Sequence, residues 1–123
     1  NEAQGPVRDV VIEPEYLDIS LPAGAAYDHP TKLGHTVFAY VFEGVVMFGA
    51  GKAARVEHEH LAIFDDGDSL AMTAGEASTR LLLVSGKPLG EPVAWRGPIV
   101  MNTQAELRLA FEEYQNGTFI KKR

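Results

Sequence analysis

The sequence predicts an all-β fold, an antiparallel barrel or sandwich that ends in one α-helix. Apolar and β-branched runs of about four to eight residues recur between turn signals roughly every ten residues, which is typical of such folds. One helical pattern occurs, near the end of the chain, whereas a parallel α/β sheet would alternate strands with helices. The length of 123 residues suits a single hydrophobic core.

The expected strands follow from alternation and from turn residues. Leu17, Ile19 and Leu21 alternate with polar residues, which indicates a strand buried on one face. Glu43-Gly44 indicates a tight turn that would join the runs on either side of it as a hairpin. The predicted strands cover residues 16–21, 37–42, 45–48, 61–64, 70–73 and 80–84.

The helix is expected over residues 103–115. Thr103 and Glu106 form a capping box, in which each side chain accepts a hydrogen bond from a free backbone N–H of the first turn. Gly117 suits the position after the helix end, where a positive φ is favoured. An apolar stripe at helical spacing predicts a packing surface made of Leu107, Ala110, Phe111 and Tyr114.

The segment before the helix predicts an irregular arm. Pro88, Pro92 and Pro98 fix φ and lack backbone N–H donors, so we expect no ordinary strand or helix there. The residues between them are too apolar to remain in water: Leu89, Val93, Trp95, Ile99, Val100 and Met101. We therefore expect the arm to lie on its own domain or on a neighbour.

Composition excludes several classes of function. A net charge of −6 and a pI near 5.1 argue against direct nucleic-acid binding. The absence of cysteine excludes disulfides, thiol catalysis and thiolate metal sites. We find no signal peptide and no apolar run of transmembrane length, so the expected location is the cytoplasm. Because Asn1 is not an initiator methionine, we interpret the chain as a fragment or a processed protein.

Three sequence motifs resemble the C-terminal part of the pirin family. They are Gly-Lys-Pro-Leu-x-Glu-Pro from Gly86, Trp-x-Gly-Pro-x-Val-Met-Asn-Thr from Trp95, and Tyr-Gln-Asn-Gly-x-Phe from Tyr114. Pirins are bicupins, and this chain resembles only the second barrel. The resemblance implies one domain over residues 1–123, a cupin-type antiparallel β-barrel (a jelly-roll-like, double-stranded β-helix) at about 7–85, with the arm and helix at about 86–123.

The same resemblance implies iron in the first barrel, on a His-x-His and Glu set that precedes a Tyr-Val-x-Glu-Gly segment. Here that segment is Tyr40 to Gly44, and counting back from it places Pro30, Lys32 and Thr36 at the ligand positions. Proline has no donor atom and lysine is normally cationic. The later strand, residues 70–79, contains no histidine. We therefore expect no cofactor and no catalytic residue in this chain.

Histidines elsewhere leave an alternative open. His58 and His60 are two residues apart, so in a strand both imidazoles would face one side and could bind a metal. The competing interpretation is a polar turn that enters the strand at Leu61. His35 is expected at the surface or barrel rim and His29 in a loop. Gly49 to Lys52 lacks the spacing of a phosphate loop and predicts a hairpin turn.

The favoured function is non-catalytic: a metal-free cupin domain that packs against a metal-bearing cupin barrel or against another copy of itself. The expected interface residues are Trp95, Arg96, Met101, Phe111, Tyr114 and Phe119. One alternative, also implied by the resemblance, is a part in an iron-dependent, quercetinase-like dioxygenase. Another is a cupin barrel that binds a small molecule in an apolar cavity.

Overall fold

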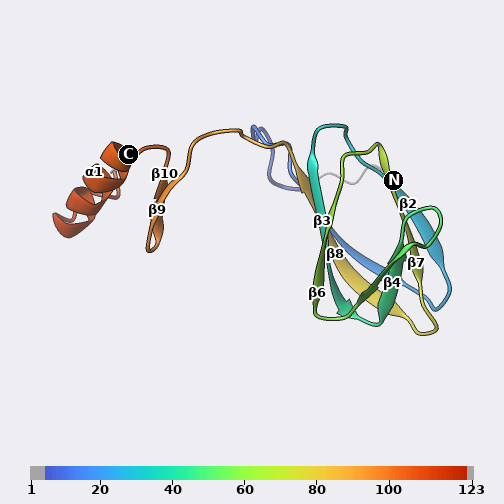
Figure 1. The fold of residues 1–123 in the computed structure, drawn as a ribbon. Coiled ribbons are helices and arrows are strands. Elements are labelled where there is room, and N and C mark those ends of the chain that lie inside the picture. The colour runs from blue at the N-terminus through green and yellow to red at the C-terminus, as the bar shows by residue number, and fades with distance from the viewer. Residues whose placement is uncertain (1–4, 122–123) are drawn as a thin grey trace. The chain divides into compact units, whose positions relative to one another are not determined.

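The computed structural model describes residues 5–121, and these form two compact units. Unit 1 holds the described residues up to Pro88, and unit 2 begins at Leu89 (Figure 1). Each unit has its own hydrophobic cluster. All strand pairs in the described residues are antiparallel, as the sequence predicts.

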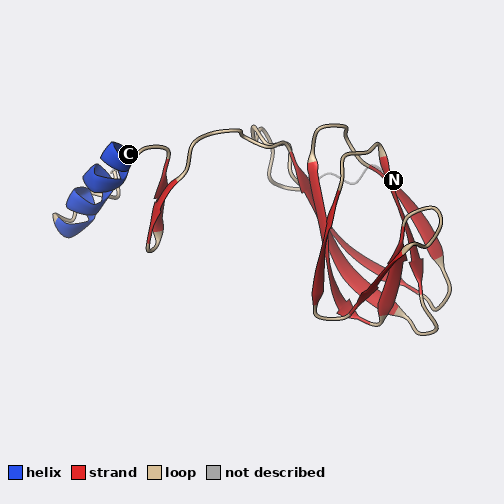
Figure 2. Ribbon diagram, viewed as in Figure 1, coloured by secondary structure: helices blue, strands red, loops and turns tan. Residues whose placement is uncertain are grey.

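Unit 1 is a barrel of two four-stranded sheets (Figure 2). The first sheet has the order β1-β8-β3-β6 and contains β1 (Glu15–Leu21), β8 (Thr79–Gly86), β3 (Thr36–Glu43) and β6 (His60–Phe64). The second has the order β2-β7-β4-β5 and contains β2 (Ala26–Pro30), β7 (Ser69–Ala74), β4 (Val45–Phe48) and β5 (Ala54–Glu57).

The core of unit 1 lies between the two sheets. Inward positions alternate along the strands, as the period of two requires. Eleven buried residues form one cluster, and its largest fully buried side chains are Phe48, Met72, Leu81, Leu83, Val41 and Val46. Phe48 also meets Phe64 of the opposite sheet edge to face, with ring centroids 4.8 Å apart. Side chains therefore fill the middle of the barrel.

Unit 2 is a short hairpin packed on a helix. The hairpin consists of β9 (Ala94–Arg96) and β10 (Ile99–Met101), and the helix is α1 (Gln104–Gln115). Its core has four buried residues, Ala94, Ile99, Leu107 and Ala110. The predicted helix is confirmed: Thr103 Oγ1 accepts a hydrogen bond from Glu106 N at 3.2 Å, and Gly117 has a φ of +72°. The Glu106 carboxylate accepts its bond from Asn102 N, one residue before the position expected.

Two expectations from the sequence are wrong, one about strand pairing and one about the arm. Residues 37–42 and 45–48 do form strands, but β3 and β4 do not pair, because the chain passes from the first sheet to the second at Gly44. The arm is not free of strands either. Its prolines lie outside β9 and β10, and Pro98 and Gly97 (φ +56°) form the turn between these strands. In unit 1, β2 and β5 were not predicted, since their polar residues hide the alternation.

Candidate functional site

The three residues at the cupin ligand positions do not form a metal site. Pro30 is the last residue of β2, and Thr36, at the start of β3, is exposed. The Lys32 ammonium donates to Glu13 Oε2 at 3.0 Å. None of the three offers a carboxylate or imidazole, so these positions do not fit the iron that the cupin resemblance implies.

His29 is instead a buried polar residue of the barrel wall. It lies in β2, not in the expected loop, and it is only 8% exposed. Its Nε2 contacts the carboxylate of Glu15 on β1, and its Nδ1 is 3.0 Å from the hydroxyl of Tyr27. Both ring nitrogens therefore have protein partners, and this arrangement connects β2 to the start of β1.

A second histidine lies near a second carboxylate. His35 Nε2 is 3.8 Å from Glu13 Oε2, and the His35 side chain is largely covered. The hydrogen bond from Lys32, with the charges of Lys32 and His35, lowers the pKa of the Glu13 carboxyl below its usual value. Glu13 is thus held ionised by its neighbours, as in a surface ion pair.

His58 and His60 do not lie in one strand, which is the geometry that the ligand-pair alternative assumes. His58 lies in the turn after β5 and His60 begins β6, and both are exposed. The His60 ring nitrogen Nδ1 lies 3.0 Å from the carbonyl oxygen of His58. Glu59 between them has a φ of +63°, which is turn geometry rather than strand geometry.

Within residues 5–121, no group of three or more His, Asp or Glu side chains is placed to hold a metal ion. Each of the two histidine–glutamate contacts above provides two donors, fewer than the three protein ligands of a typical catalytic site. The donor set of this part of the chain does not fit the iron of a cupin centre.

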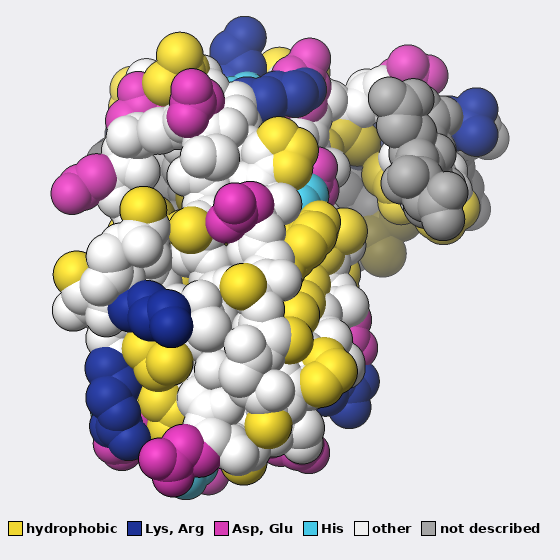
Figure 3. All heavy atoms as spheres, turned by 90° about the vertical axis from the view of Figure 1, so that its right-hand side faces the viewer, with side chains coloured by type: hydrophobic (Ala, Val, Ile, Leu, Met, Phe, Trp, Pro, Cys, Tyr) yellow, Lys and Arg dark blue, Asp and Glu magenta, His cyan; other side chains and the backbone are white. Residues whose placement is uncertain are grey.

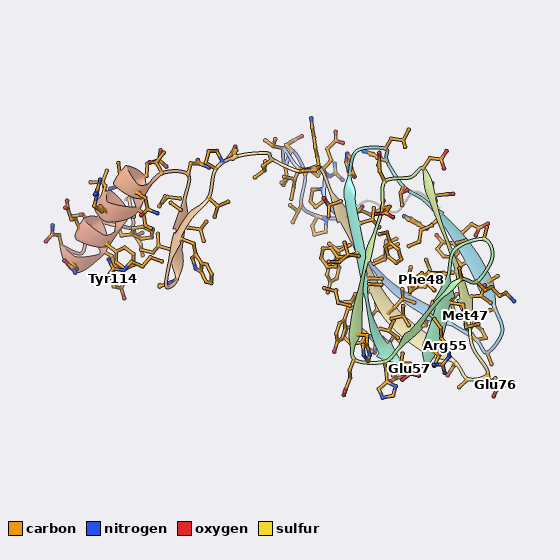
Figure 4. All side chains as sticks on the ribbon, viewed as in Figure 1. Met47, Phe48, Arg55, Glu57, Glu76 and Tyr114 are labelled. Atoms are coloured by element: carbon orange, nitrogen blue, oxygen red, sulfur yellow. The ribbon has the colours of Figure 1, made fainter. Side chains whose placement is uncertain are left out.

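A pocket of about 340 Å³ opens at one end of the barrel, between the two sheets. Its walls are mainly apolar and include Val37, Phe48, Phe64 and Leu70, with Asp65 and Asp66 among the lining residues. Phe48 points between the sheets in Figure 4. Asp66 accepts a hydrogen bond from Gly34 N at 2.6 Å, so this carboxylate holds a loop in place.

The six expected interface residues all lie in unit 2. Trp95 is 72% and Tyr114 68% exposed (Tyr114 is labelled in Figure 4). Arg96 lies 5.0 Å above the ring of Phe111, a cation–π contact within the unit. Met101 and Phe111 pack against the buried cluster, and Phe119 meets Tyr114 edge to face at 6.5 Å. Met101 and Phe111 therefore stabilise the unit from within, whereas Trp95 and Tyr114 are left exposed on its surface.

The outside of the first sheet carries an apolar surface that the sequence did not predict. Tyr16, Leu61 and Ile63 are all more than half exposed there. The sequence does contain a sign of this surface, in the continuous apolar runs Val37–Phe42, Leu61–Phe64 and Leu81–Val84. A run without alternation indicates a strand that is apolar on both of its faces. The same runs predict strands, but a continuous run does not indicate which of its faces will be left outward.

Among residues 5–121 there is no helix with the length and apolar character that a membrane crossing demands. The one described helix, α1, has 12 residues and is amphipathic.

Known proteins resemble this chain over nearly its whole length. The family model of the pirin C-terminal cupin domain matches residues 16–120. Pirin-1 of Arabidopsis thaliana is 38% identical over 104 residues, and human Pirin is 36% identical over 103; each match covers 82% of this chain and 36% of the relative. A quercetin 2,3-dioxygenase structure from Acinetobacter baumannii superposes with a TM-score of 0.85 at 31% identity, covering 95% of this chain and 40% of that one. This chain thus spans about two fifths of the length of these relatives. It belongs to the pirin family, as a C-terminal cupin domain.

Proposed function

We propose that this chain is a supporting cupin domain, metal-free itself, that packs through unit 2 against a metal-bearing cupin barrel. The observation behind this proposal is the size of unit 2. It has 35 residues, four of them buried in its core, and the chain has no cysteine with which to staple it. Units of fewer than about 40 residues usually need a disulfide, a metal or a partner to be stable.

The surface of unit 2 supports a partner. On the outer side of its hairpin, Trp95 and Val100 are cross-strand neighbours, 72% and 57% exposed, and Val93 beside them is 74% exposed. The Trp95 indole donates to the carbonyl of Gly97 at 2.7 Å, which holds the ring in one orientation. A rigid aromatic side chain flanked by valines is typical of an anchor in a protein interface.

The donor chemistry supports assigning the metal to the partner. The cupin ligand positions hold Pro30, Lys32 and Thr36, and the described histidines and carboxylates do not group around a metal. Dioxygenase chemistry of the kind named for the A. baumannii relative would then belong to the partner barrel. This chain would contribute stability and shape to the assembly.

Metal analysis with native mass spectrometry tests the first half of the proposal. The full chain, purified from cells supplied with iron, copper and manganese, is expected to hold no stoichiometric transition metal. One metal per chain, lost in the His58→Ala and His60→Ala variants, would replace this proposal with the enzymatic alternative.

Co-expression tests the second half. The probe is the part of Arabidopsis Pirin-1 that lies outside the match, produced together with this full chain. We expect a 1:1 complex that retains iron. Trp95→Glu should abolish it, whereas Leu109→Glu, at a 55% exposed position of α1, should not. A complex that tolerates Trp95→Glu would show that the outer face of the hairpin is not the contact.

A further inference from the structure

The outer side of the first sheet in unit 1 carries two cross-strand rows of apolar side chains, here called the outer apolar face. The first row runs across all four strands as Tyr16, Val84, Phe38 and Ile63. The second contains Leu82, Tyr40 and Leu61. Tyr16, Ile63 and Leu61 are 67%, 74% and 55% exposed, and the other four are partly exposed.

The second sheet provides a comparison within the same unit. Its outward positions hold mainly small or polar residues, such as Asp28, Ser69, Ala71, Thr73 and Arg55, and its larger apolar residues there are Val45 and Met47 on β4. Figure 3 shows this side of unit 1, where a band of hydrophobic side chains lies beside acidic, basic and other groups. Outward apolar rows are therefore a property of the first sheet rather than of both barrel walls.

From this asymmetry we propose that two copies of this chain pair through their outer apolar faces, sheet against sheet. The proposal goes beyond the proposed function, because it concerns a different surface of the chain and a second copy as the partner. It does not involve unit 2.

Charge supports a second copy as the occupant. Neither row has a charged side chain at its centre, so two molecules of net charge −6 can meet there without opposing like charges. Asp18, at the β1 end of the second row, is already paired with Arg80, whose Nη2 lies 2.7 Å and Nε 3.1 Å from the two carboxylate oxygens. A face whose charges are satisfied internally needs no charged partner.

The surface area that pairing would bury also supports a second copy as the partner. Aromatic side chains bury about 150–250 Å² each when fully covered. Allowing for their present exposure, the rows and the adjacent Phe42 can remove roughly 600 Å² of surface per copy, or about 1,200 Å² per pair, which is the lower limit of stable interfaces. Two twisted sheets also pack face to face at about −30° without interpenetration of their backbones.

Sedimentation velocity of the full chain over a range of concentrations tests the pairing. We expect a reversible dimer. Ile63→Glu should weaken it at least tenfold, because it places a carboxylate in an apolar interface. Tyr16→Glu, at the opposite edge of the sheet, should do the same. Leu33→Glu is the matched control, since Leu33 is 70% exposed but lies in the β2–β3 loop.

Any other result would overturn the inferred pairing of two copies. The possible results also distinguish a failure of this inference from a failure of the proposed function. A monomer at all concentrations would exclude pairing, while the Pirin-1 co-expression would still test unit 2. A dimer lost in Trp95→Glu but kept in Ile63→Glu would assign self-association to unit 2. If the chain alone is monomeric and Ile63→Glu prevents assembly with the Pirin-1 segment, the face binds a different barrel. Urea unfolding of every variant confirms that the substitutions leave the fold intact.

Discussion

The Thr79 side chain has opposing effects on the stability of unit 1, at a point where the chain crosses between the two sheets. It is 2% exposed, and among the described residues its Oγ1 has no hydrogen-bond partner. A buried hydroxyl without a partner loses its bonds to water and gains nothing in return. Its methyl group, in contrast, packs beside Gly44.

Two substitutions at Thr79 separate these effects. Thr79→Val replaces the hydroxyl by a methyl group of similar volume and should raise the free energy of unfolding by about 1 kcal/mol. Thr79→Ser keeps the hydroxyl and loses the methyl group, so it should lower the free energy by about 1 kcal/mol. Urea unfolding monitored by circular dichroism measures both. Loss of stability in Thr79→Val would mean that the hydroxyl has a partner in solution.

The ion pair of Asp18 and Arg80 should make stability depend on pH. The hydrogen bond from Arg80, with its charge, lowers the pKa of Asp18 below its usual value. A lowered folded-state pKa gives a contribution that is present above the unfolded pKa, near 4, and is lost as pH falls through the folded pKa. Both side chains are about half exposed, so the contribution is small.

Asp18→Asn should therefore be slightly less stable than the native chain near pH 7, and the difference should vanish once the pH falls below the lowered pKa of Asp18. Urea unfolding at several pH values measures the difference. A difference that stays constant over this range would show that the substitution acts through packing and not through the carboxylate charge.

Among the elements, the connection between β3 and β4 is the one that shapes the barrel. Gly44 has a φ of +75°, and a Cβ there would lie 2.6 Å from the carbonyl oxygen of Ser78 and 2.8 Å from Cγ2 of Thr79. The first contact is with backbone, which cannot move aside cheaply. Gly44 thus lets the chain leave one sheet and enter the other against the start of β8.

Gly44→Ala should lower the free energy of unfolding by roughly 2–4 kcal/mol, since the positive φ costs 1–2 kcal/mol and overpacking adds to it. Gly24 is the control, because its φ is +69° and an added methyl group there would meet no atom within 4 Å. Gly24→Ala should cost only about 1 kcal/mol. Equal losses at the two sites would mean that backbone strain, and not the close approach, decides the residue at 44.

For the whole molecule, the two units should differ in stability. Unit 1 has eleven buried residues in its cluster and unit 2 has four. Local opening requires less free energy where fewer apolar groups are buried. Hydrogen exchange should therefore be at least about tenfold faster for α1 amides than for those of β3 and β8.

Exchange measured at two pH values controls for the intrinsic chemical rate. Equal protection in α1 and in the β3 and β8 strands would show that unit 2 opens only when the entire chain unfolds. If unit 2 binds a partner barrel as proposed, the α1 amides should exchange more slowly in the Pirin-1 complex than in the chain alone.

Local patterns in the sequence determined the strands of the first sheet, β4 and β7 of the second, the capped helix, and which side chains stand at the positions that the resemblance assigns to metal ligands. These depend on neighbours in the chain: the alternation at Leu17 and Ile19, the Thr103 cap, and Pro30 where a donor atom is needed.

Only the tertiary structure decided which strands pair. The Glu43-Gly44 turn is compatible with a hairpin and with a crossover, and the choice depends on β8 and β7, which lie far along the chain and pair with β3 and β4. The same holds for His29, whose burial follows from Glu15 on a neighbouring strand. The outer apolar face needs both kinds of information: the apolar runs are local, but strand order and register bring their outward residues together into one surface.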